Sequence, residues 1–244
     1  MNFKEIEKNR INSNGFCCLA LIDPDIKNEN KLDQILSNIN NSNFSGILVG
    51  GSLIMDDKFD VRVKYIYENT DLPVFIFPGS SNQVTTHCDF LLYLTLLSGR
   101  NPEYLISEHV RSAPRIYNSD IKTISTGYIL LESNKRTSVE IISDTLPLPM
   151  DKHDIILAHA LAGQYLGNSL MYLDCGSGSD ITVQPKLVHY LNKHLSIPIM
   201  VGGGITTPSH VKEISDSGAA YIVIGSLLEN LDNANLIDEM TSAI

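Results

Sequence analysis

Glycine-rich segments mark the places in this 244-residue sequence where a ligand could meet the main chain. Glycine lets backbone N–H groups approach a ligand closely, although each segment taken alone also fits an ordinary tight turn. Gly202 and Gly225 lie 23 residues apart, the length of one strand–helix unit, and this spacing favours a phosphate cradle built by two successive loops. The segments, each just after an apolar run, are GGS (50–52), PGS (78–80), GSGS (176–179), GGG (202–204) and GS (225–226).

The segment LIDPD (21–25) is a candidate metal site. Asp23 and Asp25 flank a proline that stiffens the turn between them. Mg²⁺ prefers oxygen ligands, commonly one or two carboxylates together with substrate phosphates, so these acids are candidate ligands beside a phosphate site. Ser52, in the next glycine segment, could add a hydroxyl. Asp-Pro-Asp is also an ordinary turn sequence, and that interpretation stays open.

A third segment, YLDCGSGS (172–179), supplies a candidate general base. Asp174 ends an apolar run immediately before the glycine–serine loop. A carboxylate there could accept the proton of a hydroxyl group whose phosphate is held nearby. Tyr172 lies two residues earlier on the same strand face, where it could equally be an aromatic residue of the interior.

The elements that must position these residues alternate between short apolar strands and amphipathic helices. Eight predicted strands in 244 residues leave about 30 residues for each strand–helix unit. This pattern predicts an α/β protein with a closed (β/α)8 TIM-type barrel, with a doubly wound open sheet as the alternative. In such a barrel the loops after the strands form one face, which would gather the segments above. The predicted strands are 16–22, 46–50, 73–77, 89–94, 126–132, 170–174, 197–201 and 221–225.

Two connections depart from a regular barrel. Residues 78–88, between the third and fourth strands, are too few for a helix and two loops, so we expect that outer helix to be shortened or missing. Residues 133–150 form a long connection with two prolines, which predicts an excursion from the barrel. Because no linker or low-complexity tract interrupts the chain, we predict a single domain over residues 1–244.

Composition narrows the class of protein. Lys and Arg number 18 against 28 Asp and Glu, and the net charge of −10 argues against a nucleic-acid partner. With 43% hydrophobic residues, wholesale disorder is excluded. The four cysteines have no CxxC spacing, no apolar signal segment opens the chain, and no apolar run approaches the ~20 residues of a membrane span. These features predict a cytoplasmic protein.

The ordered set of segments resembles the motifs of the geranylgeranylglyceryl phosphate synthase family and its bacterial prenylglyceryl phosphate synthases. The similarity covers nearly the whole chain and is greater to the second group of the family. The matching segments are LIDPD (21–25), ILVGGS (47–52), LLSGRNP (96–102), STGYILLE (125–132), LAGQYLG (161–167), YLDCGSGS (172–179), VGGGI (201–205) and VIGS (223–226).

The resemblance implies a Mg²⁺-dependent prenyltransferase. Such an enzyme joins a polyprenyl diphosphate, for this family geranylgeranyl diphosphate, to the C3 hydroxyl of sn-glycerol 1-phosphate and releases diphosphate. Asp23 and Ser52 would contact Mg²⁺, and Asp174 would take the hydroxyl proton. The resemblance also implies a homo-oligomer, with a peripheral membrane contact for the lipid product. Glycerol phosphate would be held by Tyr172, Leu173, Asp174, Cys175, Gly176, Ser177, Gly178, Gly203, Gly204, Gly225 and Ser226.

The chain departs from the family at two positions. Asp174 stands where the family carries glutamate, which shortens the reach of the side chain by ~1.5 Å. Leu21 stands where the first group carries a lysine directed at the phosphate.

Arg100 could assist diphosphate binding or be an ordinary exposed residue. Tyr93, Leu96 and Tyr104 are candidates for the wall of an isoprenoid groove, although barrel packing is the simpler interpretation.

Two other functions fit part of the sequence. Another phosphate-binding barrel enzyme, such as an isomerase or an aldolase, is one; the predicted strands contain no lysine, which disfavours Schiff-base chemistry. A barrel that binds a phosphorylated ligand without catalysis is the other, and the aspartate at position 174 leaves it open.

Overall fold

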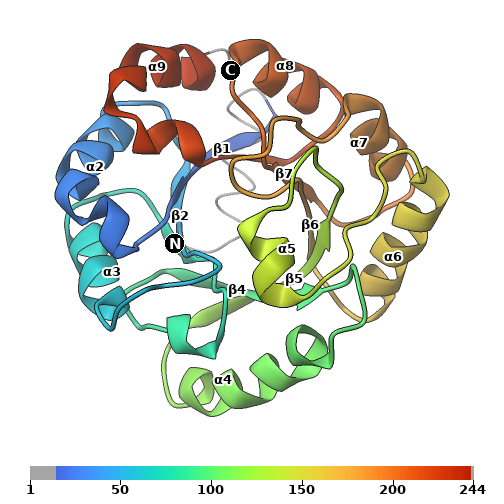
Figure 1. Cartoon of the computed structure of the whole chain (residues 1–244), viewed down its shortest axis with the longest axis horizontal. Helices are drawn as coiled ribbons and strands as arrows, with labels where there is room; N and C mark the ends of the chain where they lie inside the picture. Colours follow the sequence, from blue (N-terminus) through green and yellow to red (C-terminus); the bar gives the residue numbers. More distant parts are fainter. Residues whose placement is uncertain (1–14, 243–244) are drawn as a thin grey trace.

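The computed structural model describes residues 15–242, and their eight strands form a closed parallel barrel in chain order (Figure 1). Every strand pairs with its neighbours in sequence, and β8 pairs with β1 to close the barrel. The predicted (β/α)8 fold is therefore confirmed, and the open sheet is excluded. The strands are β1 (Cys17–Ile22), β2 (Gly46–Val49), β3 (Val74–Ile76), β4 (Phe90–Leu96), β5 (Lys122–Leu130), β6 (Leu170–Asp174), β7 (Ile199–Gly202) and β8 (Tyr221–Ile224).

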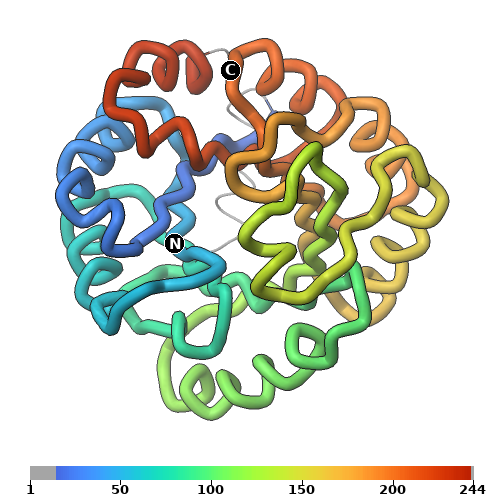
Figure 2. The backbone as a smooth tube through the Cα atoms, viewed as in Figure 1, coloured from blue at the N-terminus to red at the C-terminus, as the bar shows by residue number. Residues whose placement is uncertain are grey.

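Helices surround the barrel (Figures 1 and 2). Between β3 and β4 the chain forms only a 3-10 turn, η2 (Ser81–Gln83), which confirms that a full outer helix is missing there. Further short helical segments are η1 (Ile26–Lys31), the π-helical η3 (Glu103–Ser107), η4 (Ser226–Glu229) and η5 (Leu231–Asn233). The α-helices are α2 (Leu32–Asn40), α3 (Phe59–Glu68), α4 (Glu108–Tyr117), α5 (Ser138–Ser143), α6 (His153–Tyr165), α7 (Pro185–Asn192), α8 (Pro208–Asp216) and α9 (Ala234–Ser242).

Side-chain alternation along the strands divides the core into two layers. On β6, Leu170 and Tyr172 pack inside the barrel, whereas Met171 and Leu173 pack between the barrel and the helices. This follows from the two-residue period of a strand, because both faces of a parallel sheet are covered. Since the same period places Asp174 on the face of Tyr172, the strand delivers its carboxylate into the barrel mouth.

The strand β5 begins four residues before its predicted start at residue 126. Its first residues, Lys122 and Thr123, are exposed and polar, yet they pair in register with Phe90 and Leu91 of β4. Pairing with a neighbouring strand thus extends β5 into a polar segment outside the apolar run that predicted it. Lys122 lies at the amino end of the strand, away from the carboxyl ends that form the mouth, so the argument against Schiff-base chemistry is unchanged.

The predicted excursion from the barrel is present after β5. Leu131 forms an isolated bridge with Leu148, and between them α5 lies across the barrel mouth in Figure 1. Its residues Val139 and Ile142 line the cavity described below. The segment at residues 1–14, which shows no signal-like sequence, lies outside the described residues. Within residues 15–242, none of the helices combines the length and apolar character needed to cross a bilayer.

Candidate active site

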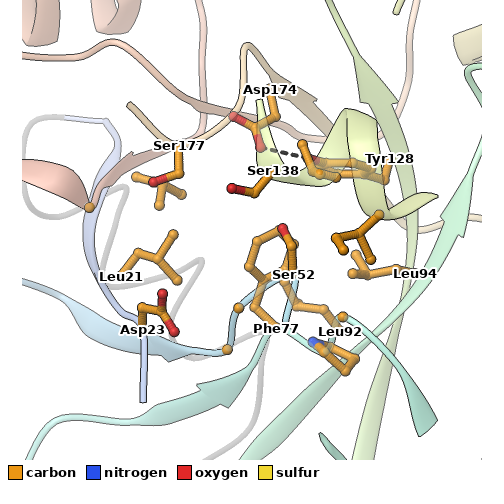
Figure 3. A pocket seen from close by; sticks show the side chains of 18 of the residues that line it. Leu21, Asp23, Ser52, Phe77, Leu92, Leu94, Tyr128, Ser138, Asp174 and Ser177 are labelled. Carbon is orange, nitrogen blue, oxygen red and sulfur yellow. Dashed lines mark hydrogen bonds between the residues drawn. The ribbon is translucent and has the colours of Figure 1, made fainter. Parts of the chain in front are cut away.

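A cavity of about 570 Å³ opens at the carboxyl ends of the barrel strands (Figure 3). Asp23 and Ser52 line it after β1 and β2, and Asp174 lines it at the end of β6. The phosphate-loop residues Gly203, Gly204, Gly225 and Ser226 line the same cavity. The structure therefore brings the two predicted acids and the two predicted glycine loops into one site, as a barrel with loops on one face requires.

The loops after β6, β7 and β8 meet through main-chain geometry. Gly203 and Gly204 have φ values of +81° and +69°, which favour glycine. A Cβ atom on Gly204 would lie 2.0 Å from the carbonyl oxygen of Ile181. The amide of Gly178 donates to the hydroxyl of Ser226 over 3.1 Å, which joins the loop after β6 to the loop after β8. This part of the cavity is thus shaped by close backbone packing that side chains could not enter.

Asp174 is 6% exposed, and both of its carboxylate oxygens accept hydrogen bonds. The Tyr128 hydroxyl donates to Oδ2 over 2.6 Å (Figure 3), and the Gly176 amide donates to Oδ1 over 2.8 Å. Burial raises the pKa of the Asp174 carboxyl above its ordinary value, and the two hydrogen bonds oppose that rise. A buried carboxylate with a raised pKa at a cavity wall is suited to general-base chemistry.

Tyr128 is a site residue that the sequence analysis did not single out. It lies on β5 directly opposite Tyr172 of β6, and the two rings meet edge to face with centroids 5.3 Å apart. Tyr172 is buried and also lines the cavity, so the interior role and the site role weighed for it both apply. The period of β5 could have placed Tyr128 in the barrel, but its hydrogen bond depends on the pairing of β5 with β6.

Three of the residues predicted to hold glycerol phosphate lie outside the cavity wall. Leu173 and Cys175 are fully buried in the layer between barrel and helices, on the strand face opposite to Tyr172 and Asp174. Gly176 does not line the cavity, and its amide is engaged by the Asp174 carboxylate. The structure thus places these three away from the cavity wall, and their part in binding glycerol phosphate stays a prediction. Tyr172, Asp174, Ser177 and Gly178 are the residues of that segment that line the cavity.

The two oxygens of Asp23 have different surroundings. Oδ2 forms an ion pair with the Lys27 ammonium over 2.8 Å, whereas Oδ1 is buried and has no hydrogen-bond partner. Oδ1 lies close above Gly51, since a Cβ atom there would approach it to 2.6 Å. Burial raises the pKa of Asp23, and Lys27 opposes that rise. An unpartnered buried carboxylate oxygen at a cavity wall fits a cation ligand.

The loop that carries Ser52 is held in place on both sides. The Gln83 side chain donates to the Gly51 carbonyl over 2.7 Å, and its oxygen accepts from the amides of Gly51 and Gly79. The Asp25 carboxylate accepts from the Met55 amide over 2.7 Å. Asp25 therefore joins the first loop to the second, which is a structural role, whereas Asp23 keeps one unpartnered oxygen, Oδ1, at the site.

Asp23 and Ser52 offer oxygen donors in the loops after β1 and β2. Oxygen donors fit Mg²⁺ better than a metal that prefers nitrogen or sulfur. Asp23 and Ser52 line the wall together. Among residues 15–242, no group of three or more His, Cys, Asp or Glu side chains is placed to hold a metal ion. A cation bound here would therefore depend on oxygens of the substrate as well as on the protein.

The remaining wall is apolar and aromatic. The predicted wall residues Tyr93, Leu96 and Tyr104 all line the cavity. Tyr93 and Tyr104 direct their hydroxyls to the carbonyls of His109 and Ile142. Arg100 does not line it, because its guanidinium donates to the Gly99 carbonyl and lies near His159. Other apolar lining residues are Leu21, Phe77, Leu92, Leu94, Val139 and Ile142.

Comparison with known proteins places this site in a family. The model of the PcrB family matches residues 8–244. The chain belongs to the PcrB family. The geranylgeranylglyceryl phosphate synthase of Flavobacterium johnsoniae is 41% identical over 89% of this chain and 90% of the relative. The protein of the same name from Chitinophaga pinensis is 38% identical over 92% of this chain and 88% of the relative.

Solved structures agree with the family. The crystal structure of (S)-3-O-geranylgeranylglyceryl phosphate synthase from Thermoplasma acidophilum, in complex with its substrate sn-glycerol-1-phosphate, has a TM-score of 0.89 and 29% identity. The structural match covers all of this chain and 98% of the Thermoplasma chain. A thiamine phosphate pyrophosphorylase from Pyrococcus furiosus, at 12% identity and a TM-score of 0.60, shares the fold alone. The PcrB-family chain is thus confirmed as an enzyme of the prenyltransferase class.

Proposed function

We propose that this PcrB-family enzyme transfers a polyprenyl group, with geranylgeranyl as the first candidate, to the C3 hydroxyl of sn-glycerol 1-phosphate in a Mg²⁺-dependent reaction. The observation that carries this proposal is the composition of one cavity. It holds a buried carboxylate beside three glycine loops, an unpartnered acid oxygen at Asp23, and an apolar wall. The names of the relatives support the same reaction.

Glycerol phosphate would bind at the end formed by the loops after β6, β7 and β8. Gly203, Gly204, Gly225 and Ser226 present main chain and a hydroxyl to the cavity there. Backbone N–H groups can bind a phosphate without a positive side chain, which suits a protein of net charge −10. Binding there would place the glycerol hydroxyls toward Asp174 in the same cavity.

Asp174 would act as the general base. The C3 oxygen forms the ether bond to C1 of the prenyl group, and its proton passes to the Asp174 carboxylate. The allylic C–O bond breaks at the same centre, and its electron pair leaves with the diphosphate. Tyr128 and Gly176 hold the carboxylate in place through their hydrogen bonds, so its orientation is set before the substrate binds.

Asp23 and Ser52 would hold Mg²⁺ together with the diphosphate. The metal, when bound, would neutralise charge on the departing diphosphate. The hydrocarbon chain would lie against the apolar wall near Leu92 and Leu94, where each buried CH₂ contributes ~0.8 kcal/mol. A homo-oligomeric assembly, a cytoplasmic location and a peripheral membrane contact for the lipid product stay predictions.

The test is a turnover assay with the purified chain. Radiolabelled prenyl diphosphates of several chain lengths are incubated with Mg²⁺ and sn-glycerol 1-phosphate, and the organic-soluble product is counted. We expect product with at least one chain length, none with sn-glycerol 3-phosphate at the same concentration, and none after chelation of the metal. Absence of product at every chain length, with glycerol 1-phosphate still bound, would instead support a barrel that binds without catalysis.

A further inference from the structure

The cavity is rich in acids although its proposed substrates are anions. Within residues 15–242, one Lys or Arg side chain lines it, and that residue is Lys27. His109 also lines it, but burial lowers the pKa of that imidazole, so it is neutral near neutral pH. A diphosphate entering here therefore meets one permanently charged side-chain cation. The carboxylates of the lining are Asp23, Asp25, Glu108, Asp174 and Glu229.

The Lys27 side chain belongs to the end of the cavity formed by the loops after β1 and β2, and it pairs with two acids. It follows the LIDPD segment on η1, and its ammonium is 2.8 Å from Oδ2 of Asp23. The same ammonium is 3.4 Å from Oε1 of Glu229, at the end of η4, which directly follows the phosphate loop at Gly225. The side chain is 53% exposed, so it keeps contact with solvent and with anything that enters the mouth.

We propose that Lys27 is a substrate-binding residue whose ammonium group contacts the diphosphate of the prenyl donor. The proposal rests on the proposed function and adds a residue that neither the sequence motifs nor the family resemblance singled out. Oδ2 of Asp23 forms an ion pair with the Lys27 ammonium, whereas Oδ1 has no hydrogen-bond partner. If Oδ1 binds a metal ion that also holds the diphosphate, the diphosphate lies close to Oδ2 of the same carboxylate. The Lys27 ammonium on Oδ2 is then within reach of the diphosphate.

The chemistry of an ammonium suits this role. Lysine has three N–H donors. Nζ can therefore keep its ion pair with Asp23 while a phosphate oxygen replaces Glu229 as its second partner. When the allylic C–O bond breaks, its electron pair remains on the bridging oxygen of the diphosphate, and the leaving group becomes more negative. Lys27 would donate a charge-assisted hydrogen bond to that group without transferring a proton.

A purely structural role is the competing explanation, because Lys27 could simply orient Asp23. Lys31 offers a matched control. It lies one turn further along η1 and donates to the Glu229 carbonyl over 3.3 Å, yet it does not line the cavity. Replacing either lysine by methionine removes one positive charge from the same short segment, so the loss of charge does not separate the two variants. Lys27→Arg keeps a cation beside Asp23, and the separate measurement with glycerol 1-phosphate reports a general disturbance of the site.

The experiment measures binding of inorganic diphosphate by calorimetry at saturating Mg²⁺. We expect Lys27→Met to weaken its affinity by about tenfold to a hundredfold, the range for a lost hydrogen bond to a charged group. Lys27→Arg should stay within about threefold of the wild type, and Lys31→Met within about twofold. Affinity for glycerol 1-phosphate should change by less than about twofold in Lys27→Met, because that ligand binds at the other end.

The inference is overturned if Lys27→Met binds diphosphate as tightly as the wild type, or if Lys31→Met loses as much affinity. It is also overturned if Lys27→Met loses glycerol 1-phosphate affinity to the same extent, since that would indicate a general effect on the site. Because the ion pair of Lys27 is solvent-exposed, Lys27→Met should unfold within about 2 °C of the wild type, and circular dichroism checks this.

These binding measurements do not need turnover, so they separate the two proposals. A wild type that forms no ether lipid in any assay contradicts the proposed function, whereas the diphosphate measurements still test Lys27. Where the wild type is active, Lys27→Met should raise the KM for the prenyl diphosphate and lower kcat, and leave the KM for glycerol 1-phosphate unchanged. An unchanged KM for the prenyl diphosphate would contradict the contact.

Discussion

The two ends of the cavity present different groups to a charged ligand. At the end formed by the loops after β6 to β8, the wall contains glycine main chain with positive φ together with the hydroxyls of Ser177 and Ser226, and the Gly178 amide donates to the Ser226 hydroxyl. At the end formed by the loops after β1 and β2, the wall is made by side chains, namely Asp23, Lys27 and Ser52. One end thus depends on backbone shape, and the other on removable charged groups.

This difference predicts how each end responds to mutation. At the end after β6 to β8 the removable side-chain groups include the hydroxyls of Ser177 and Ser226, whereas the glycine main chain should weaken only through a substitution that alters its backbone or blocks its space. A side-chain site should lose its function in steps, as each charged or hydroxyl group is removed. Asp174 stands between these cases, because a side chain supplies the chemistry while a backbone amide and a tyrosine fix its position.

The largest effect should come from Asp174→Asn, which removes the proposed base but keeps the size of the side chain. We expect kcat to fall by about 10²- to 10⁴-fold, the usual contribution of a positioned general base. Affinity for glycerol 1-phosphate should change little, because the loops proposed to bind its phosphate remain. Steady-state turnover and calorimetry measure the two quantities; a variant that turns over like the wild type would remove Asp174 from the mechanism.

The next effect should come from Asp23→Asn at the side-chain end. We expect a loss of about a hundredfold in kcat/KM and a higher Mg²⁺ requirement, because the unpartnered oxygen would no longer carry charge. Chelation of the metal should abolish turnover of the wild type. Asp154→Asn, an exposed aspartate on α6 outside the cavity, is the control and should retain full activity. Equal Mg²⁺ dependence of Asp23→Asn and wild type would contradict the metal site.

A smaller effect should distinguish shape from strain at the main-chain end. Gly204→Ala combines a positive φ with a Cβ atom 2.0 Å from the Ile181 carbonyl, so we expect about a tenfold loss of glycerol 1-phosphate affinity. Gly167→Ala has a similar positive φ but no atom within 4 Å of its Cβ, and it lies outside the cavity. It should cost about 1 kcal/mol of stability and no affinity. Equal loss of affinity in both variants would mean that strain alone decides.

The main-chain end was the more predictable of the two from the sequence. The spacing of the glycine segments by one strand–helix unit predicts that the loops after β7 and β8 lie side by side. Gly203 and Gly204 line the cavity as this spacing predicts. The family motif includes Leu173 and Cys175 among the binding residues, whereas the alternation along β6 and the residue after it directs both side chains toward the helices. A motif gives the order of residues, whereas strand period decides which of them reach the site.

The contacts that join segments far apart in the chain could not be predicted. Lys27 forms an ion pair with Glu229, which lies near the other end of the sequence. The helix α5 lies over the mouth because Leu148 pairs with the end of β5. The early start of β5 at Lys122 also depends on its partner strand. In each case the stabilising contact is provided by another element, so the local sequence alone does not determine it.

The smallest effect concerns Tyr128, whose hydrogen bond lowers the pKa of Asp174 against the larger effect of burial. A base must be deprotonated to act, so the acidic limb of kcat/KM reports the pKa of Asp174 in the free enzyme. Tyr128→Phe removes the donor and should raise that pKa further. We therefore expect the acidic limb to move to higher pH, with a loss of a few-fold in kcat/KM at neutral pH.

Tyr172→Phe is the matched control for this shift. Its ring packs against Tyr128 in the same cavity, but Tyr172 donates no hydrogen bond to Asp174. It should leave the acidic limb in place even if substrate binding weakens. A limb that stays in place in Tyr128→Phe, or moves to lower pH, would mean that another group titrates. A shift in Tyr128→Phe alone would show that the pKa of Asp174 is tuned by the neighbouring strand, separately from the glycine loops that are proposed to hold the phosphate.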